Sequence, residues 1–506
     1  MTRKRFRSDV RKPLHAKKQI TVRMALPARI IAFLIALALA GAATARQSVR
    51  PISDVTLPTP AARSMPTATP PITETNQQFL DAADQVLAQM SHILDLPIKR
   101  PLKKSLRSRA QIRAYLLQEA KHGENKSQQY ADDKSLEAFG LIPKGFPLDS
   151  FMIDLLTEQI AGMYDPKAKE FYIADWIPIG DQRGVMAHEM THALEDQSFH
   201  VERWMNAARS NDDAEMARDS VSEGSAMVAM IDYSLRDTHV TVRDLPDLTD
   251  LFGSGAFMSM GQDPLLAKAP AYIRDSLVFP YLEGATFTQQ FLKAHTGWAD
   301  LHLLFQNPPV STQQIMHPAL YLKGVQPANV TLPKWKRVAP KNWKLLEQNV
   351  MGEFGLEELL KQFIGEQRAV AISPVWSGDR YAVFEVKQTE QTPIVYRLKL
   401  DNTQDAAKLF GEFGDALEKK YPTATHIESQ SNFLEFQTPS GAVFLRCVAD
   451  ECLDVESASR ATFDAIDRAI GWTPAPDSAS TGSISAAQDR QQETARASTA
   501  PAVVVQ

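Results

Sequence analysis

Two histidines in the segment VMAHEMTHALEDQSF (residues 185–199) have the spacing of metal ligands on a helix. His188 and His192 are four residues apart, so a helix places both imidazoles on one face, where they can contact the same ion. Met186 and Met190 mark a different, apolar face that would pack into a core. The segment therefore predicts a buried helix that presents two nitrogen ligands.

Glu189 directly follows the first histidine, and its carboxylate would approach the ion without being a ligand. Zinc needs neutral imidazoles and one position open to water, whose pKa it lowers to roughly 7. A neighbouring carboxylate can take the proton of that water during attack on a peptide carbonyl and pass it to the leaving amine. Glu189 is the predicted general base, and one Zn²⁺ is the predicted cofactor.

A catalytic zinc site uses three protein ligands, and the third must come from another segment. The HExxHxxGxxH extension is absent, because six residues after the second histidine the chain has Ser198. Glu223 lies in SVSEGSAMVAMIDY (residues 220–233), a predicted helix that is apolar on nearly every side. A charged carboxylate there costs several kcal/mol unless a cation or hydrogen bonds compensate it. Glu223 is the preferred third ligand; the alternatives are an ion pair between Glu223 and Arg218, or Glu283 as the ligand.

A helix with HExxH, followed some thirty residues later by a helix with Glu, Gly and small residues (residues 223–226), resembles the gluzincin group of zinc metallopeptidases. Gly224 would let these two helices approach closely. The resemblance covers residues 77–364 and, less clearly, the C-terminal part. It implies a mainly helical, zincin-like catalytic domain in which a short edge strand near Phe171 lies beside the active-site cleft. Four segments also resemble exported bacterial gluzincin-like proteins, few of which have an assigned substrate: AGMYDP (161–166), HEMTHALEDQ (188–197), FPYLEG (279–284) and STQQIMHP (311–318).

One position departs from the thermolysin-like branch of that group. The branch has an acidic residue four positions after the ligand glutamate, where it supports a histidine, but here that residue is Met227. Asp196 or Asp219 would have to supply this support. The chain also lacks the Gly-x-Met-Glu-Asn string that captures free amino termini in related aminopeptidases, which favours an endopeptidase.

Hydrolysis also needs a hydrogen-bond donor for the oxyanion that develops on the carbonyl. Two residues in the family-like segments are candidates. His317 ranks first, because it precedes Pro318, which favours extended backbone in a loop. Tyr281 ranks second. The alternative for both is core packing or a loop hydrogen bond.

The composition limits the partners. With 44% hydrophobic and 23% charged residues, the chain has the composition of a soluble globular protein. The net charge is −5, and the basic residues crowd into the first two dozen positions, which excludes nucleic acid as a partner. The predicted partner is a protein or peptide substrate. Two other functions stay open: a catalytically inactive zincin-fold binding module, which would not need Glu189, and a metal-dependent amidase that uses the same site.

The N-terminus predicts export. Lys and Arg dominate residues 2–29, an apolar run follows at 30–40, and Ala43-Thr44-Ala45 resembles a cleavage site, so residues 1–45 form the predicted signal peptide. The apolar run is shorter than the ~20 residues of a spanning helix. The alternative is an uncleaved inner-membrane anchor at residues 25–45. Both place the catalytic part outside the cytoplasm, either periplasmic or secreted.

Composition and periodicity divide the chain into five parts and predict an α+β fold. The C-terminal unit is expected to be a small α+β accessory domain with the order β-β-α-β-β-α. The parts are the signal or anchor (1–45), a Pro/Thr-rich linker (46–76), the metallopeptidase domain (77–364), the accessory domain (365–472) and a Ser/Ala/Gln-rich tail (473–506).

The chain has only two cysteines, Cys447 and Cys452, which flank a short turn. In an oxidising compartment they can form a disulfide across a hairpin. The alternative is two unrelated core residues.

Overall fold

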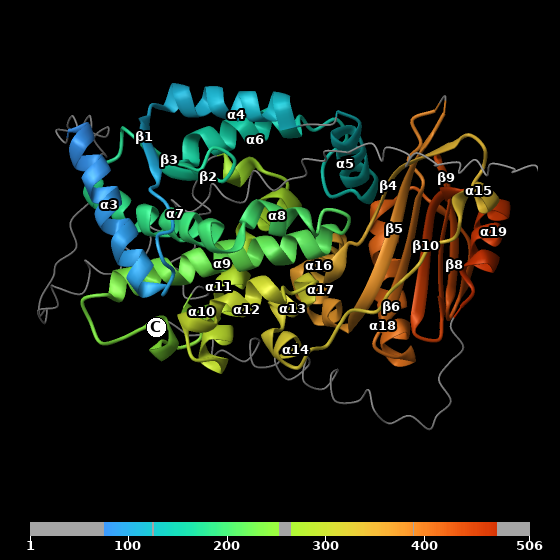
Figure 1. The fold of residues 1–506 in the computed structure, drawn as a ribbon. Coiled ribbons are helices and arrows are strands. Elements are labelled where there is room, and N and C mark those ends of the chain that lie inside the picture. Colours follow the sequence, from blue (N-terminus) through green and yellow to red (C-terminus); the bar gives the residue numbers. More distant parts are fainter. Residues whose placement is uncertain (1–74, 124–125, 252–264, 388, 473–506) are drawn as a thin grey trace, which may run out of the picture.

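A computed structural model of the chain describes residues 75–123, 126–251, 265–387 and 389–472. The predicted signal peptide, nearly all of the linker and the C-terminal tail lie outside the described residues. Helices and a small sheet form the N-terminal part, and a larger antiparallel sheet forms the C-terminal part (Figure 1). The fold class is therefore α+β, as the sequence predicts. No helix of the described segments is long and apolar enough to cross a bilayer.

The N-terminal part is mainly helical and is built around three long helices. These are α7 (Ile179–Phe199), α9 (Asp212–Leu235) and α11 (Ala271–Ala294), which lie near the middle of the molecule (Figure 1). The other helices of this part are α3 (Asn76–Ile93), α4 (Arg109–Gly123), α5 (Lys126–Phe139), α6 (Leu148–Gln159), α8 (Val201–Asn206), α10 (Leu248–Leu251), α12 (Leu301–Gln306), α13 (Thr312–Met316), α14 (Pro318–Leu322), α16 (Gly352–Ile364) and α17 (Glu366–Ile372). The short helix α15 (Trp335–Val338) lies beside the C-terminal sheet instead.

A three-stranded sheet lies against α7. Its strands are β1 (Lys103–Arg107), β2 (Gly162–Asp165) and β3 (Glu170–Ala174), in the order β1-β3-β2. The expectation of an edge strand near Phe171 is wrong, because β3 is the central strand: β1 pairs with it in parallel and β2 in antiparallel orientation. The edge strand next to α7 is β2.

The C-terminal sheet has seven antiparallel strands in the order β4-β5-β6-β10-β9-β8-β7. Helix α18 (Thr403–Lys420) packs on this sheet, and α19 (Arg460–Ile470) packs near β10. The strands are β4 (Trp343–Asn349), β5 (Trp376–Val386), β6 (Ile394–Leu400), β7 (Thr425–Gln430), β8 (Phe433–Thr438), β9 (Gly441–Val448) and β10 (Glu451–Ala458).

The predicted β-β-α-β-β-α order is too short. After α18 the structure has four strands where the sequence predicts two, and the additional strands are β7 and β10. The sheet also includes β4, which precedes the predicted domain boundary at Gly365. Strand β7 is polar and exposed at nearly every position, so it lacks the alternation of a half-buried strand. Strand β10 is buried almost throughout although it contains three acidic residues.

Cys447 of β9 and Cys452 of β10 form a disulfide. The two residues are direct cross-strand partners in the antiparallel pairing. Of the two alternatives that the sequence leaves open, the structure has the bridged hairpin.

Helices α9 and α11 cross with their backbones almost in contact. A Cβ atom on Gly224 would lie 2.1 Å from the carbonyl oxygen of Gly284, and one on Gly284 would lie 2.2 Å from the carbonyl oxygen of Ser220. Gly224 was expected to face the HEMTH helix, and this expectation is wrong. Consecutive helical residues point about 100° apart, so Glu223 faces α7 while Gly224 faces α11. The crossing fixes the position of the helix that carries Glu223.

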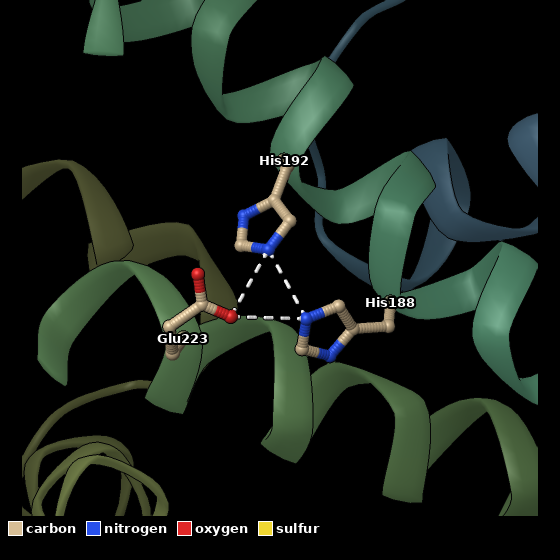
Figure 2. Close-up of side chains that lie close together, drawn as sticks. All are labelled: His188, His192 and Glu223. Atoms are coloured by element: carbon tan, nitrogen blue, oxygen red, sulfur yellow. Dashed lines mark hydrogen bonds and ion pairs between the residues drawn. The ribbon is translucent and has the colours of Figure 1, made fainter. Parts of the chain in front are cut away.

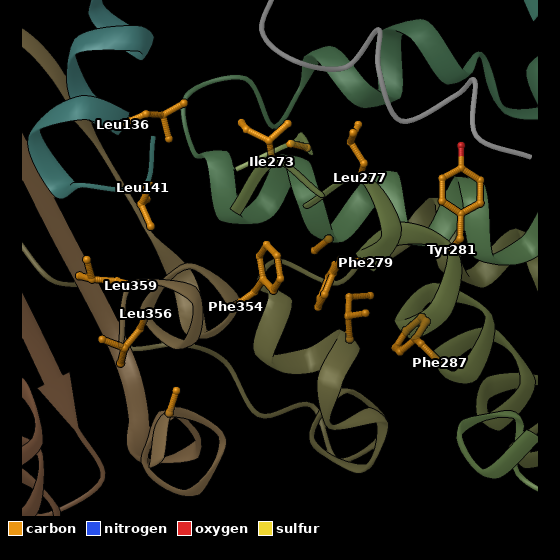
Figure 3. Packing of buried hydrophobic residues seen from close by; sticks show 14 of the residues in the cluster. Leu136, Leu141, Ile273, Leu277, Phe279, Tyr281, Phe287, Phe354, Leu356 and Leu359 are labelled. Carbon is orange, nitrogen blue, oxygen red and sulfur yellow. The ribbon is translucent and has the colours of Figure 1, made fainter. Parts of the chain in front are cut away.

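One hydrophobic core extends from α11 through α16 to the C-terminal sheet (Figure 3). Phe279 of α11 packs against Phe354 of α16, with their ring centroids 4.3 Å apart, and Leu277 and Leu356 belong to the same core. The same core includes Tyr381 of β5. The site-bearing helices and the sheet therefore share their packing.

The crossing of α9 and α11 predicts that Gly224→Ala destabilises the protein. The new methyl group meets backbone atoms that cannot move without separating the helices, so the free energy of unfolding should fall by about 2–3 kcal/mol. Gly411 in α18 is the matched control, because a Cβ there meets nothing within 4 Å. Gly411→Ala should raise the stability by about 0.5–1 kcal/mol. Chemical denaturation measures both, and equal stabilities of the two variants would contradict the close crossing.

Candidate metal centre

His188, His192 and Glu223 converge on one point between α7 and α9 (Figure 2). The Nε2 atoms of the two histidines are 3.1 Å apart, and Oε2 of Glu223 lies 3.2 Å from His188 Nε2 and 3.4 Å from His192 Nε2. All three ligand atoms lie within 4.8 Å of one another. The structure thus brings together the three residues that the sequence proposes as metal ligands.

The site is buried because both helices are enclosed by other elements. The side chains of His188 and Glu223 are fully buried, and His192 is 7% exposed. The apolar face of α7, including Met186 and Met190, packs in a core with α3 and β3, as the periodicity predicts. The polar face of α7 is therefore directed towards α9.

Glu189 points to a different neighbour from the two histidines. Its Oε2 accepts a hydrogen bond of 2.7 Å from the backbone N–H of Tyr164 in β2, and the residue is 1% exposed. Among the described residues, the group that could hold a metal does not include Glu189. This arrangement fits the expected role of a carboxylate near the ligands that is not itself a ligand.

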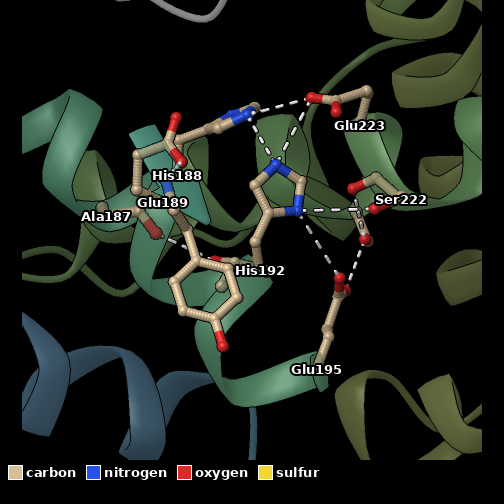
Figure 4. A network of polar contacts seen from close by, with 10 residues as sticks. Ala187, His188, Glu189, His192, Glu195, Ser222 and Glu223 are labelled. Carbon is tan, nitrogen blue, oxygen red and sulfur yellow. Dashed lines mark hydrogen bonds and ion pairs between the residues drawn. The ribbon is translucent and has the colours of Figure 1, made fainter. Parts of the chain in front are cut away.

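The carboxylate next to Nδ1 of His192 belongs to Glu195 (Figure 4). Its Oε2 lies 3.9 Å from His192 Nδ1, and its Oε1 accepts a hydrogen bond of 2.5 Å from Ser225 of α9. The hydroxyl of Ser222 lies 3.4 Å from the same imidazole nitrogen. Neither Glu195 nor Ser222 is predicted from the sequence, although Glu195 stands three positions after His192, a spacing that places two side chains on one helix face.

Of the two expected supporting carboxylates, Asp196 and Asp219, Asp196 contacts the β2–β3 hairpin. Asp196 accepts hydrogen bonds of 2.7 Å from the Tyr164 hydroxyl and from Lys169 Nζ, so it anchors the β2–β3 hairpin to α7. Asp219 lines a cavity one helical turn before Glu223. The structure therefore corrects the prediction: Glu195 is beside a histidine, and Asp196 is not.

The charges around His192 are mostly negative. Burial lowers its pKa, but the carboxylates of Glu223, Glu195 and Glu189 outweigh this and raise the pKa to about 10. Burial raises the pKa of Glu223, but His192 and hydrogen bonds from both histidines lower it to about 2. Burial lowers the pKa of His188, against its hydrogen bond to Glu223. The pocket is therefore an environment that favours a positive charge next to the three donor atoms.

The two expected oxyanion donors differ in their surroundings. The ring of Tyr281 on α11 stacks on that of His188, with a centroid distance of 6.1 Å and an interplanar angle of 23°. His317 lies between α13 and α14, and its Nε2 is 2.7 Å from Oε1 of Glu353 in α16. Tyr281 thus lies beside a candidate ligand, although the sequence ranks His317 first.

Glu283, the rival third ligand, is not part of the three-residue group in the described part of the chain. It lies on α11 beside Gly284, and burial, with the nearby Glu357 carboxylate, raises its pKa to about 7. Of the two glutamate–glycine pairs, the structure brings only Glu223 to the histidines.

The comparison with known families matches the C-terminal sheet, and the matched segment does not include the residues of the candidate metal centre. Residues 343–467 match the model of a family described as a domain of unknown function (DUF8575). The matched segment begins at the first residue of β4 and ends within α19, so it contains the whole seven-stranded sheet. No curated protein and no solved structure is detectably similar to this chain.

The geometry behind His192 generates a prediction with two neighbouring variants. Glu195→Gln removes the charge beside Nδ1 and should weaken metal binding about 10–100-fold, which is the usual effect of losing such a partner. Asp196→Asn should leave metal affinity nearly unchanged, because Asp196 contacts Tyr164 and Lys169 instead. Competition with a chelator of known affinity measures both. A larger loss of affinity for Asp196→Asn would contradict the assignment.

Proposed function

We propose that this protein is a gluzincin-type zinc metallopeptidase that hydrolyses peptide bonds outside the cytoplasm. The observation that carries the proposal is the convergence of two imidazole nitrogens and one carboxylate oxygen, within 4.8 Å of one another, from two buried helices. Two nitrogens and one oxygen are a ligand set of catalytic zinc sites.

The surroundings of these residues fit a cation. Oε1 of Glu223 is fully buried and has no hydrogen-bond partner among the described residues. A buried ionised oxygen without a partner costs several kcal/mol, and a divalent cation would compensate that cost. His188, His192 and Glu223 would hold the ion, and Glu195 would orient the His192 ring from the opposite side.

The roles of the chain's own side chains follow from their positions. The bound zinc would supply Lewis acidity to a water molecule and to the scissile carbonyl group. Glu189 would accept the proton of that water and return it to the leaving amine. The Tyr164 N–H would hold the Glu189 carboxylate in place through its hydrogen bond. Tyr281 is the preferred candidate for the oxyanion donor because its ring lies beside that of His188.

Burial has a consequence for the substrate. His188, Glu189 and Glu223 are at most 1% exposed, so a peptide bond can reach them only when neighbouring segments move apart. Exclusion of water strengthens electrostatic interactions inside such a site. The proposal therefore includes an opening motion near His192, the most exposed of these four residues.

The location outside the cytoplasm has two independent supports. The N-terminal pattern of basic, apolar and small residues is typical of export signals. The Cys447–Cys452 disulfide is of a kind that persists in oxidising compartments such as the periplasm and is rare in the cytosol.

The first test separates catalysis from metal binding. Glu189→Gln removes the general base but none of the three ligands, so zinc content should stay at about one ion per chain. Hydrolysis of a quenched protein substrate should fall about 10²–10⁴-fold, the usual contribution of a positioned base. If Glu189→Gln cleaves as fast as the wild type, the mechanism is wrong. If the wild type binds zinc and hydrolyses neither peptides nor amides, the protein is a binding module.

The second test concerns the third ligand. Glu223→Gln keeps the shape of the side chain and removes its charge, so the variant should lose most of its zinc when dialysed against a weak chelator. Glu283→Gln is the matched control, because Glu283 precedes the glycine on the other side of the α9–α11 crossing and should keep its zinc. Metal analysis of the folded variants decides, and the reverse result would exchange the two roles.

A further inference from the structure

Tyr164 of β2 contacts α7 at two points, once through its backbone and once through its side chain. The backbone N–H donates a hydrogen bond of 2.7 Å to Oε2 of Glu189, and the hydroxyl donates one of 2.7 Å to Oδ2 of Asp196. Glu189 and Asp196 are seven residues apart, so they lie on one face of α7, about two turns from each other. One residue of the strand therefore spans two turns of the helix that carries both histidines.

The contact through the hydroxyl is buried. Tyr164 is 4% exposed and Asp196 is 1% exposed. Burial and the Asp196 carboxylate raise the pKa of the Tyr164 hydroxyl, so it stays protonated and donates. A hydrogen bond to a carboxylate is roughly twice as strong as one between neutral groups. The Tyr164 side chain is therefore a strong attachment of β2 to α7.

Lys169, in the turn between β2 and β3, makes a second contact with Asp196. Its Nζ donates a hydrogen bond of 2.7 Å to the same Oδ2 atom. The backbone of Lys169 has a φ of 54°, a left-handed conformation that glycine adopts much more readily than lysine. The turn has a lysine where the backbone alone favours glycine, which indicates a role for the lysine side chain.

The next residue of α7 attaches the other side of the sheet. Oε1 of Gln197 accepts hydrogen bonds of 2.9 and 3.0 Å from the backbone N–H groups of Lys99 and Arg100, which precede β1. Strand β1 pairs with β3, and β3 pairs with β2. The last turns of α7 therefore hold the three-stranded sheet through both of its outer strands.

The contact at Glu189 depends on where β2 lies. In the described part of the chain β2 pairs only with β3, and its outward-facing Tyr164 N–H meets the Glu189 carboxylate. A carboxylate held by this N–H moves when the strand moves. A displacement of about 1 Å in a catalytic group can cost roughly 100-fold in rate.

We propose that the Tyr164 hydroxyl, Asp196 and Lys169 form a latch that positions Glu189 for catalysis, an inference that rests on the proposed peptidase function. The latch fixes β2 along the axis of α7, and the Tyr164 N–H then orients the Glu189 carboxylate. Asp196 and Lys169 are positioning residues, because they act on Glu189 through Tyr164. None of the three belongs to the group of metal ligands in the described part of the chain.

Tyr164→Phe tests the latch, because it removes the hydroxyl and keeps the backbone N–H. In the full-length zinc-loaded protein, kcat for a quenched peptide should fall about tenfold or more, whereas KM and zinc affinity should change less than twofold. Tyr115→Phe is the matched control. The Tyr115 hydroxyl donates a hydrogen bond of 2.9 Å to Asp165, the next residue of β2, so this variant removes the same kind of bond without touching α7. It should lower kcat less than twofold, and equal losses for the two variants would overturn the proposal.

Lys169→Gly separates positioning from stability. Glycine suits a φ of 54°, so the Tm should stay the same or rise, while loss of the contact with Asp196 should lower kcat about threefold. An unchanged kcat would show that the lysine has no positioning role. The double variant Tyr164→Phe/Asp196→Asn should be no slower than the slower single variant, since both break one contact. Additive losses would contradict a latch that acts as a unit.

Hydrogen exchange of the Tyr164 amide gives a readout without turnover. Exchange should be slow in the wild type and about tenfold or more faster in Tyr164→Phe and Asp196→Asn, with no change in Tyr115→Phe. If the wild type cleaves no peptide, the peptidase function fails, and the exchange rates alone decide whether the latch holds the Tyr164 N–H on Glu189. Equal rates in all four proteins would overturn the inference.

Discussion

The structure depends on a buried carboxylate next to two imidazoles. Glu223 is fully buried in the middle of α9, which is enclosed by α7 on one side and α11 on another. Such a group destabilises a fold by several kcal/mol unless positive charge and hydrogen bonds compensate it. The two histidines of α7 are the groups that meet it, so the register between α7 and α9 is tied to this contact. On another side of α9, Gly224 and Gly284 allow the close crossing with α11, which also fixes the position of α9.

The convergence of the three candidate ligands was predictable because it depends on local periodicity. Four-residue spacing places His188 and His192 on one face, and the apolar residues around Glu223 make an uncompensated carboxylate there improbable. The residues that contact these three side chains were not predictable in the same way. Glu195 and Asp196 are adjacent in sequence but have different partners. Tyr164 and Lys169 of the β2–β3 hairpin donate hydrogen bonds to Asp196, and their position cannot be read from the residues around it.

The C-terminal sheet shows the same limit in its strands. Strand β10 contains Glu451, Asp454 and Glu456, a composition that argues against a buried strand. It is central because distant basic residues pair with two of these acids: Arg397 of β6 with Glu451, and Lys420 of α18 with Glu456. Partners so far apart in sequence leave no local pattern. By contrast, α18 has the amphipathic periodicity of a helix, and a helix was expected at this place in the β-β-α-β-β-α order.

The sheet also has a role in holding the site, which a separate accessory domain would not have. The backbone N–H of Asp212, in the first turn of α9, donates to the Asn349 side chain at the end of β4. Asp379 of β5 accepts from the backbone N–H groups of Met351 and Gly352 at the start of α16. The N-terminal turn of the helix that carries Glu223 is thus fixed to strands of the matched family segment. Because α9 is one uninterrupted helix from Asp212 to Leu235, a shift of the sheet would displace Glu223 relative to the histidines of α7. The sheet therefore stabilises the geometry of the centre as well as its own fold.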